Sequence, residues 1–176
     1  MEEKALAPVP ESAMEAASAV EASNILDATE GKYLTVYLND HLYGIPVRDV
    51  VQIVGVEEIV PVPEFPYYAK GIMNLRGNII PIIDLRLRLG MPETGYTDRT
   101  CIIITSVREQ EVGFVVDSVD EVTDIDNSEI LSTPPSGDFK QKYVNGVCKH
   151  GSKLVLRLAV NNILNDGEIG SLYEYS

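Results

Sequence analysis

From Tyr33 onward the chain alternates between short apolar runs and turn residues. The runs are rich in β-branched side chains and read YLTVYL, YGIPV, VVQIVGV, NIIPIIDL, TCIIITS, VGFVVD and KLVLRLAV. Several short runs of this kind at regular spacing predict an all-β fold, either a sandwich or a barrel. Asn39-Asp40 predicts a tight hairpin. Asp84 before LRLRLG predicts a helix cap, an interpretation that we prefer to a catalytic carboxylate.

The chain also contains an internal repeat. The string Gly44-Ile45-x-Val47-x-x-Val50-x-x-Ile53 recurs as Gly113-Phe114-x-Val116-x-x-Val119-x-x-Val122, with strands before and after each string in the same order. Repetition in register indicates a duplication. Each copy has about five strands in roughly 65 residues, which is marginal for independent stability. We therefore expect two units that pack together and leave a groove, where binding sites concentrate.

The two ends of the chain differ from the middle. Residues 1–31 contain eight alanines, seven acidic residues and one lysine. Such a segment has little apolar area to bury, so we expect a disordered acidic tail. A transient helix over 11–25 is possible, because Ala and Glu favour helix. Residues 166–176 are expected to form a C-terminal tail.

Charge and hydropathy exclude two classes of partner. Lys and Arg number 14 against 27 Asp and Glu, which gives a net charge of −13. This charge would repel nucleic acid, and no apolar run approaches the ~20 residues of a membrane span. The acidic N-terminus lacks the basic start and apolar stretch of a signal peptide, so we expect a cytoplasmic protein without direct membrane insertion.

Signals of catalysis or metal binding are weak. Cys148 and His150 form a single pair, short of the four ligands of structural zinc. The acidic run over 117–129 lacks the central glycine and the final glutamate of a calcium loop. Nucleophile-elbow, Walker A and dinucleotide-binding motifs are absent from the sequence. We expect no catalytic residue, metal or cofactor, although a small β-barrel that binds a metabolite or acts as a hydrolase remains the alternative.

Two segments suggest contact with a partner protein. Arg76 precedes Gly77-Asn78 and should lie at a hairpin tip, either as a solvated turn residue or as an anchor for a partner. In the strand from Val50 to Val56, alternation would place apolar residues on both faces. One face would then either contact another protein or be covered by a loop of the same chain.

The segment from Lys70 to Arg86 resembles the signature G-x-x-N-L-R-G-x-x-x-P-x-x-D-L-R of the CheW family of chemotaxis adaptors. Val116-Asp117-Ser-Val119-x-x-Val122 resembles a second motif of that family, and the resemblance extends from about Tyr33 to Leu164. It implies an all-β fold of two tandem SH3-like five-stranded β-barrels with a few short helices. We expect the domain to span 32–165, with the first barrel over about 32–92 and the second over about 98–165.

The resemblance also implies a function. Members of the family are non-catalytic scaffolds that couple the cytoplasmic tip of chemoreceptors to the regulatory domain of the histidine kinase CheA, at membrane-associated receptor arrays. The implied receptor-binding residues are Val50, Gln52, Asn74 and Arg76, and the implied kinase-binding residues are Val54, Val56 and Ile59. Two positions depart from the family pattern: Gln52 stands where many relatives have Glu, and Ala159 stands where an acidic residue is common.

Overall fold

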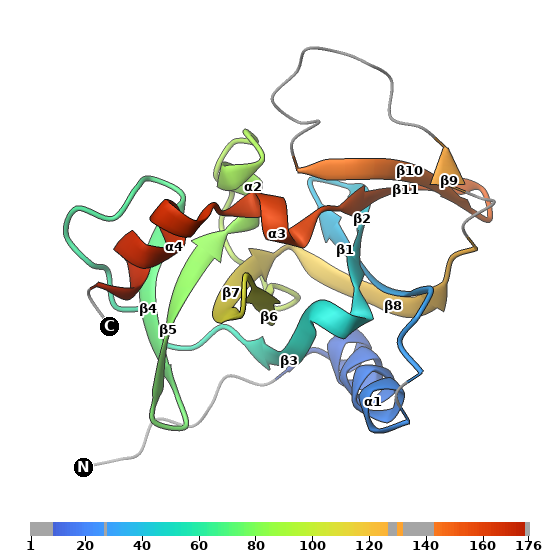
Figure 1. Cartoon of the computed structure of the whole chain (residues 1–176), viewed down its shortest axis with the longest axis horizontal. Coiled ribbons are helices and arrows are strands. Elements are labelled where there is room, and N and C mark those ends of the chain that lie inside the picture. Colours follow the sequence, from blue (N-terminus) through green and yellow to red (C-terminus); the bar gives the residue numbers. More distant parts are fainter. Residues whose placement is uncertain (1–8, 27, 127–129, 132–142, 175–176) are drawn as a thin grey trace.

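Two mixed β-sheets dominate the computed structural model, which describes residues 9–26, 28–126, 130–131 and 143–174 (Figure 1). The first sheet has the order β8 (Ser118–Asp124), β1 (Lys32–Leu38), β2 (His41–Pro46), β11 (Lys153–Leu158), β10 (Val144–His150) and β9 (Ile130–Leu131). The second has the order β3 (Val50–Gly55), β6 (Cys101–Val107), β7 (Gln110–Val116), β5 (Asn78–Asp84) and β4 (Ala69–Leu75). The expected mostly-β fold class is confirmed.

The sequence repeat is present in both sheets, but its copies exchange strands. In copy order the strands are β1 to β5 and then β6, β7, β8, β10 and β11. Each sheet combines the first two of these strands from one copy with the last three from the other, and the first sheet has the short β9 in addition. The link is a parallel pair in each sheet, β2 with β11 and β5 with β7. The expected boundaries, 32–92 and 98–165, therefore delimit the sequence copies and not the sheets.

The glycine that opens each repeated string lies at this parallel link. Gly44 is opposite Arg157, and Gly113 is opposite Ile82. A Cβ at Gly113 would lie 2.6 Å from the Cδ1 of Ile82, and one at Gly44 would lie 3.3 Å from Val155 Cγ1. The motif glycines thus allow strands of different copies to pack side by side.

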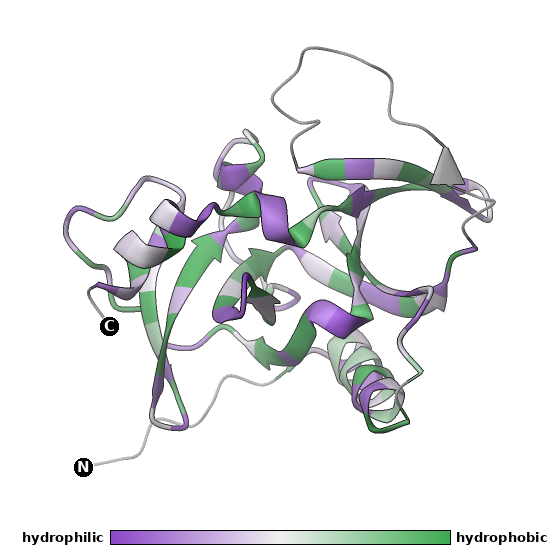
Figure 2. Cartoon of the chain, viewed as in Figure 1, coloured by the Kyte–Doolittle hydropathy of each residue, from purple (hydrophilic) through white to green (hydrophobic). Residues whose placement is uncertain are grey.

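Three apolar clusters fill the molecule. The largest joins the two sheets, with core residues such as Leu34, Val36, Ile45, Ile83, Ile103 and Phe114. A second lies within the second sheet and a third within the first. Figure 2 shows hydrophobic residues along the strands of both sheets and hydrophilic residues at the tip of the β4–β5 hairpin. The two sheets therefore share a core, so neither is an independent unit.

Helices cover the margins of the sheets. They are α1 (Glu11–Ile25), the 3-10 turn η1 (Val47–Asp49), α2 (Leu85–Arg88), α3 (Val160–Ile163) and α4 (Asp166–Tyr173). Helix α1 has the bounds of the transient helix expected over 11–25 but packs on the fold, and α4 lies in the segment expected to be a C-terminal tail. Helix α1 buries Ala13, Ala16 and Val20, and α4 buries Ile169 and Leu172. The 3–4 spacing of small apolar residues on α1 supplies an apolar stripe that composition alone conceals.

Candidate functional site

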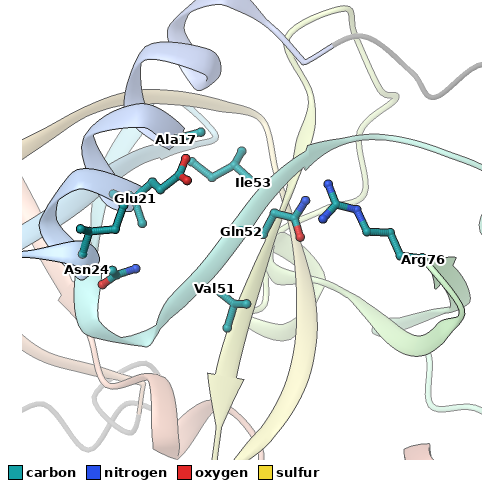
Figure 3. A pocket seen from close by; sticks show the side chains of 9 residues that line it. Ala17, Glu21, Asn24, Val51, Gln52, Ile53 and Arg76 are labelled. Atoms are coloured by element: carbon teal, nitrogen blue, oxygen red, sulfur yellow. The ribbon is translucent and has the colours of Figure 1, made fainter.

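A cleft of about 560 Å³ lies between α1, β3 and the tip of the β4–β5 hairpin (Figure 3). Its α1 side is lined by Ala17, Val20, Glu21, Asn24 and Ile25, and the remainder by Val51, Gln52, Ile53 and Arg76. Two of the receptor-binding residues expected from sequence, Gln52 and Arg76, both line this cleft, although β6, β7 and β5 lie between β3 and β4 in the sheet. The α1 wall is a part of the site that the sequence did not indicate.

Arg76 occupies the first position of the β4–β5 turn. Its φ is +54° and that of Gly77 is +91°, so the turn has two consecutive left-handed residues, as in a type I′ hairpin. The side chain of Asn74 stabilises the turn, because its Oδ1 accepts a hydrogen bond from the Gly77 N–H at 2.9 Å. The Arg76 side chain is exposed and has no polar partner among the described residues.

The left-handed backbone of Arg76 is costly for a residue with a Cβ, by roughly 1–2 kcal/mol relative to glycine. Arg108 has a similar φ of +50°, but its N–H donates to Asn161 Oδ1 and its Nε to Leu164 O, both at 2.9 Å. These hydrogen bonds stabilise the fold and so offset the cost of the left-handed backbone at Arg108. Arg76 shows none in the described chain, so its strain points to a role outside the fold.

A β-bulge decides which residues of β3 reach the surface. The pairing of β3 with β6 shifts register between Val50 and Gln52, so that Val51 is the extra residue. Val50 is therefore in the core at 2% exposure, whereas Val51 is 47% exposed and Gln52 is half-buried. The expected surface role of Val50 is not supported, because simple alternation along the strand fails at the bulge.

The expected kinase-binding residues lie towards the other end of β3. Val54 is 7% exposed and belongs to the apolar cluster within the second sheet, while Val56 and Ile59 are half-buried and pack against that cluster. Val60, exposed by 50%, follows directly. Val56, Ile59 and Val60 therefore lie at the solvent-exposed edge of this apolar cluster, and Val54 lies inside it.

Asp84 and Arg86 form a buried ion pair in the first copy, and Arg86 also reaches Asp117 in the second copy. Asp84 is the N-cap of α2, and its Oδ1 accepts from the backbone N–H of Arg86 at 3.0 Å and of Leu87 at 3.5 Å. Arg86, 1% exposed, donates to Asp84 Oδ2 at 3.0 Å and to Asp117 Oδ1 at 2.8 Å. The motif that ends at Arg86 and the motif that contains Asp117 therefore meet at the Arg86 guanidinium.

The chemistry of this pair is structural. Burial alone would lower the pKa of the Arg86 guanidinium, but the hydrogen bond to Asp84 and the charges of Asp84 and Asp117 outweigh it and raise that pKa. Sequence reasoning found the cap but missed Arg86 as its partner. The available signal was an arginine directly after a buried strand, inside the apolar run LRLRLG.

The other chemical groups considered from the sequence also have structural surroundings. His150 Nε2 lies 3.0 Å from Glu121 Oε1, and Cys148 is buried in the apolar cluster within the first sheet. Within the described ranges, no group of three or more His, Cys, Asp or Glu side chains could hold a metal ion. Residues 127–129 of the acidic run lie outside those ranges. None of the described helices has the length and apolar character needed to cross a membrane.

Comparison with known proteins identifies the fold. Residues 32–168 match the CheW-like domain. The chemotaxis protein CheW of Bacillus subtilis is 41% identical over 106 residues, which cover 60% of this chain and 68% of that protein. The CheW of Treponema pallidum is 30% identical over 144 residues, covering 79% and 85%. The crystal structure of the scaffolding protein TtCheW from Thermoanaerobacter tengcongensis superposes with a TM-score of 0.73 at 33% identity, covering 78% of this chain and 94% of that one.

With the two-sheet fold, these matches place the protein in the class of chemotaxis scaffolds. More narrowly, the chain belongs to the CheW family. It is a non-catalytic adaptor, which decides against the alternative of a metabolite-binding protein or hydrolase. Helix α1 lies before the matched region of 32–168 and is an addition to it. Ala159 stands where an acidic residue is common in the family. It is the N-cap of α3 and, as expected, provides no side-chain hydrogen bond to the helix.

Proposed function

We propose that this CheW protein couples the cytoplasmic tip of chemoreceptors to the regulatory domain of CheA through two separate surfaces. It acts in the cytoplasm at membrane-associated receptor arrays. The receptor surface consists of Val51, Gln52, Asn74 and Arg76. The kinase surface consists of Val56, Ile59 and Val60, supported from within by Val54. The adaptor carries out no bond-making step, and its contribution is to fix how the two partners lie relative to each other.

The observation that supports the receptor surface best is Arg76, which has a strained backbone and no polar partner among the described residues. A planar guanidinium at a rigid hairpin tip can donate two parallel hydrogen bonds to a carboxylate of a partner. Beside it, the exposed Val51 supplies apolar area and Gln52 a hydrogen-bonding amide. Arginine is one of the residue types enriched among the few side chains that dominate the energy of an interface.

Strand β3 connects the two surfaces and suggests how they are coupled. Gln52 lies in β3 and Val56 directly follows its last residue, Gly55, so the two are four residues apart, or about 13 Å of extended chain. The strand between them is hydrogen-bonded to β6 and buried at Ile53 and Val54. A receptor rearrangement at one end would therefore reach the kinase through a stiff element, with coupling free energies of about 1–3 kcal/mol.

Two variants titrated against both partners test this assignment. Arg76→Asp should weaken binding of a receptor-tip fragment at least tenfold and leave binding of the CheA regulatory domain within twofold. Ile59→Asp should do the reverse. Val54→Asp is a poor probe because it would place a carboxylate in an apolar cluster and destabilise the fold. If Arg76→Asp left receptor affinity unchanged, the receptor surface would lie elsewhere.

A further inference from the structure

Helix α1 lies against the outermost strand of each sheet. It packs on β8 of the first sheet and on β3 and η1 beside the second. Its contact face consists of the small residues Ala13, Ala16 and Val20, which let the helix axis approach the strands closely. The amide Nδ2 of Asn24 donates to the backbone carbonyl of Val50 at 3.5 Å. The helix is thus seated on β3, the strand that carries part of the proposed receptor surface.

The face of α1 that turns towards the cleft carries a charge opposite to that of Arg76. Figure 3 shows Glu21 on the helix and Arg76 at the hairpin tip, on opposite sides of β3, with Gln52 between them. Both charged side chains are exposed, and neither has an ion-pair partner in the part of the chain that the structure describes. The cleft therefore has an acidic wall, a basic wall and a floor of Val51 and Gln52.

Such an arrangement favours one orientation of a bound segment. A carboxylate of the partner is attracted to Arg76 and repelled by Glu21, and the reverse holds for a basic side chain. An apolar strip between the two would contact Val51 and Ile25, which are 47% and 75% exposed. Charge complementarity across the cleft thus specifies both the composition and the direction of the segment.

An α-helix fits this cleft better than an added strand. Strand addition would use the free edge of β3, but the Val50 carbonyl already accepts from Asn24 and α1 packs against the strand. A second helix could instead lie beside α1 at the usual 8–10 Å axial distance, over Val51. Its carboxylate would face Arg76 and its basic residue Glu21.

We propose that α1 is a second wall of the receptor cleft and selects the partner. The partner segment is a helix of the receptor tip that presents a carboxylate on one side, a basic residue on the other and an apolar strip between. This inference rests on the proposed receptor surface and extends it to a helix that lies outside the family match of 32–168.

Two pairs of matched variants in the full chain test the role of α1. Glu21→Lys is compared with Glu15→Lys, because Glu15 is an exposed glutamate of the same helix that does not line the cleft. Ile25→Asp is compared with Leu26→Asp, since Leu26 is 74% exposed and also lies outside the lining. Calorimetric titration with a receptor-tip fragment should show a five- to tenfold rise in Kd for Glu21→Lys and Ile25→Asp. The two controls should stay within twofold.

Arg76→Asp, measured in the same series, separates this inference from the function on which it rests. If Arg76→Asp weakens receptor binding while Glu21→Lys and Glu15→Lys have equal effects, α1 is not a wall of the site and the receptor surface stands. If Arg76→Asp and Glu21→Lys both leave the affinity unchanged, the receptor surface and the role of α1 are both wrong. Equal Kd values of all variants for the CheA regulatory domain would show that the proteins remain folded.

Discussion

The two copies of the repeat build the same five strands but differ at two equivalent points. The turn of the β4–β5 hairpin has Arg76 at a φ of +54°, whereas the turn of β10–β11 has Gly151 at +62°. The backbone requires the same left-handed conformation at both places. Only the second copy uses the residue that adopts it without cost. The first copy therefore keeps an unfavourable residue where a contact with another protein would explain it.

The second difference lies where each copy's last strand ends. Asp84 caps α2 and pairs with the buried Arg86, whereas Ala159 begins α3 with no side-chain cap bond. The second copy has its polar contacts further on, where Asn165 and Glu168 form a capping box at the start of α4. The two copies of similar fold thus place their stabilising polar contacts at different points.

The largest expected effect is at the closing junction of the first copy. Asp84→Ala should lower the free energy of unfolding by about 3–5 kcal/mol, because it leaves the Arg86 charge buried with only Asp117 as an acidic partner. Denaturant unfolding monitored by circular dichroism measures this loss. Ala159→Ser, at the equivalent point of the second copy, is the control and should change stability by less than about 1 kcal/mol. A similar small loss for Asp84→Ala would contradict the structural importance of the pair.

Arg76→Gly should separate binding from stability. Loss of the guanidinium is expected to weaken receptor binding about tenfold, which corresponds to about 1.4 kcal/mol. The melting temperature should stay unchanged or rise slightly, because glycine removes the left-handed strain while adding entropy to the unfolded chain. Calorimetric titration and thermal unfolding are measured on the same sample. A melting temperature that fell together with affinity would make Arg76 a structural residue.

The reverse exchange places an arginine in the second copy. A Cβ at Gly151 would meet no atom within 4 Å, so the cost of Gly151→Arg is confined to the backbone. We expect a loss of about 1 kcal/mol in the free energy of unfolding and no change in receptor affinity. A gain in receptor binding would show that an arginine at either hairpin tip can bind the receptor. The receptor surface would then not be specific to the first copy.

The smallest effect concerns Glu168 and depends on pH. Burial alone would raise the pKa of this carboxyl, but hydrogen bonds from the Asn165 N–H, the Tyr68 hydroxyl and Arg88 hold it below its ordinary value. The stabilisation is therefore present above the unfolded pKa and is lost as pH falls through the folded one. Glu168→Gln should cost about 1 kcal/mol at pH 7. The difference from wild type should shrink below about pH 4.5, the usual range of a glutamate. A constant difference over pH 3–7 would exclude the ionic contribution.

Periodicity and motif spacing predicted the strands, the duplication and the Asp84 cap because each leaves a local trace in the sequence. They could not locate the surface of β3, since the bulge that turns Val51 outward depends on pairing with β6. They also could not assign strands to sheets, because the parallel pairs of β2 with β11 and β5 with β7 join residues that are far apart in the sequence. The helix over 11–25 was expected only as a transient one, and its packing on the sheets was missed, because Ala13 and Ala16 are too small to give a strong amphipathic signal.

The exchange of strands between the copies has a consequence for how the chain reaches its native state. When the first copy has been synthesised, β2 still lacks β11, and β5 still lacks β7. The second sheet cannot be completed until β7 (Gln110–Val116) has emerged from the ribosome, and the first sheet must wait for β11 (Lys153–Leu158). Because the defining contacts join distant positions, assembly should be slow and all-or-none. A polypeptide cut between the copies would regain its structure only when both fragments are mixed.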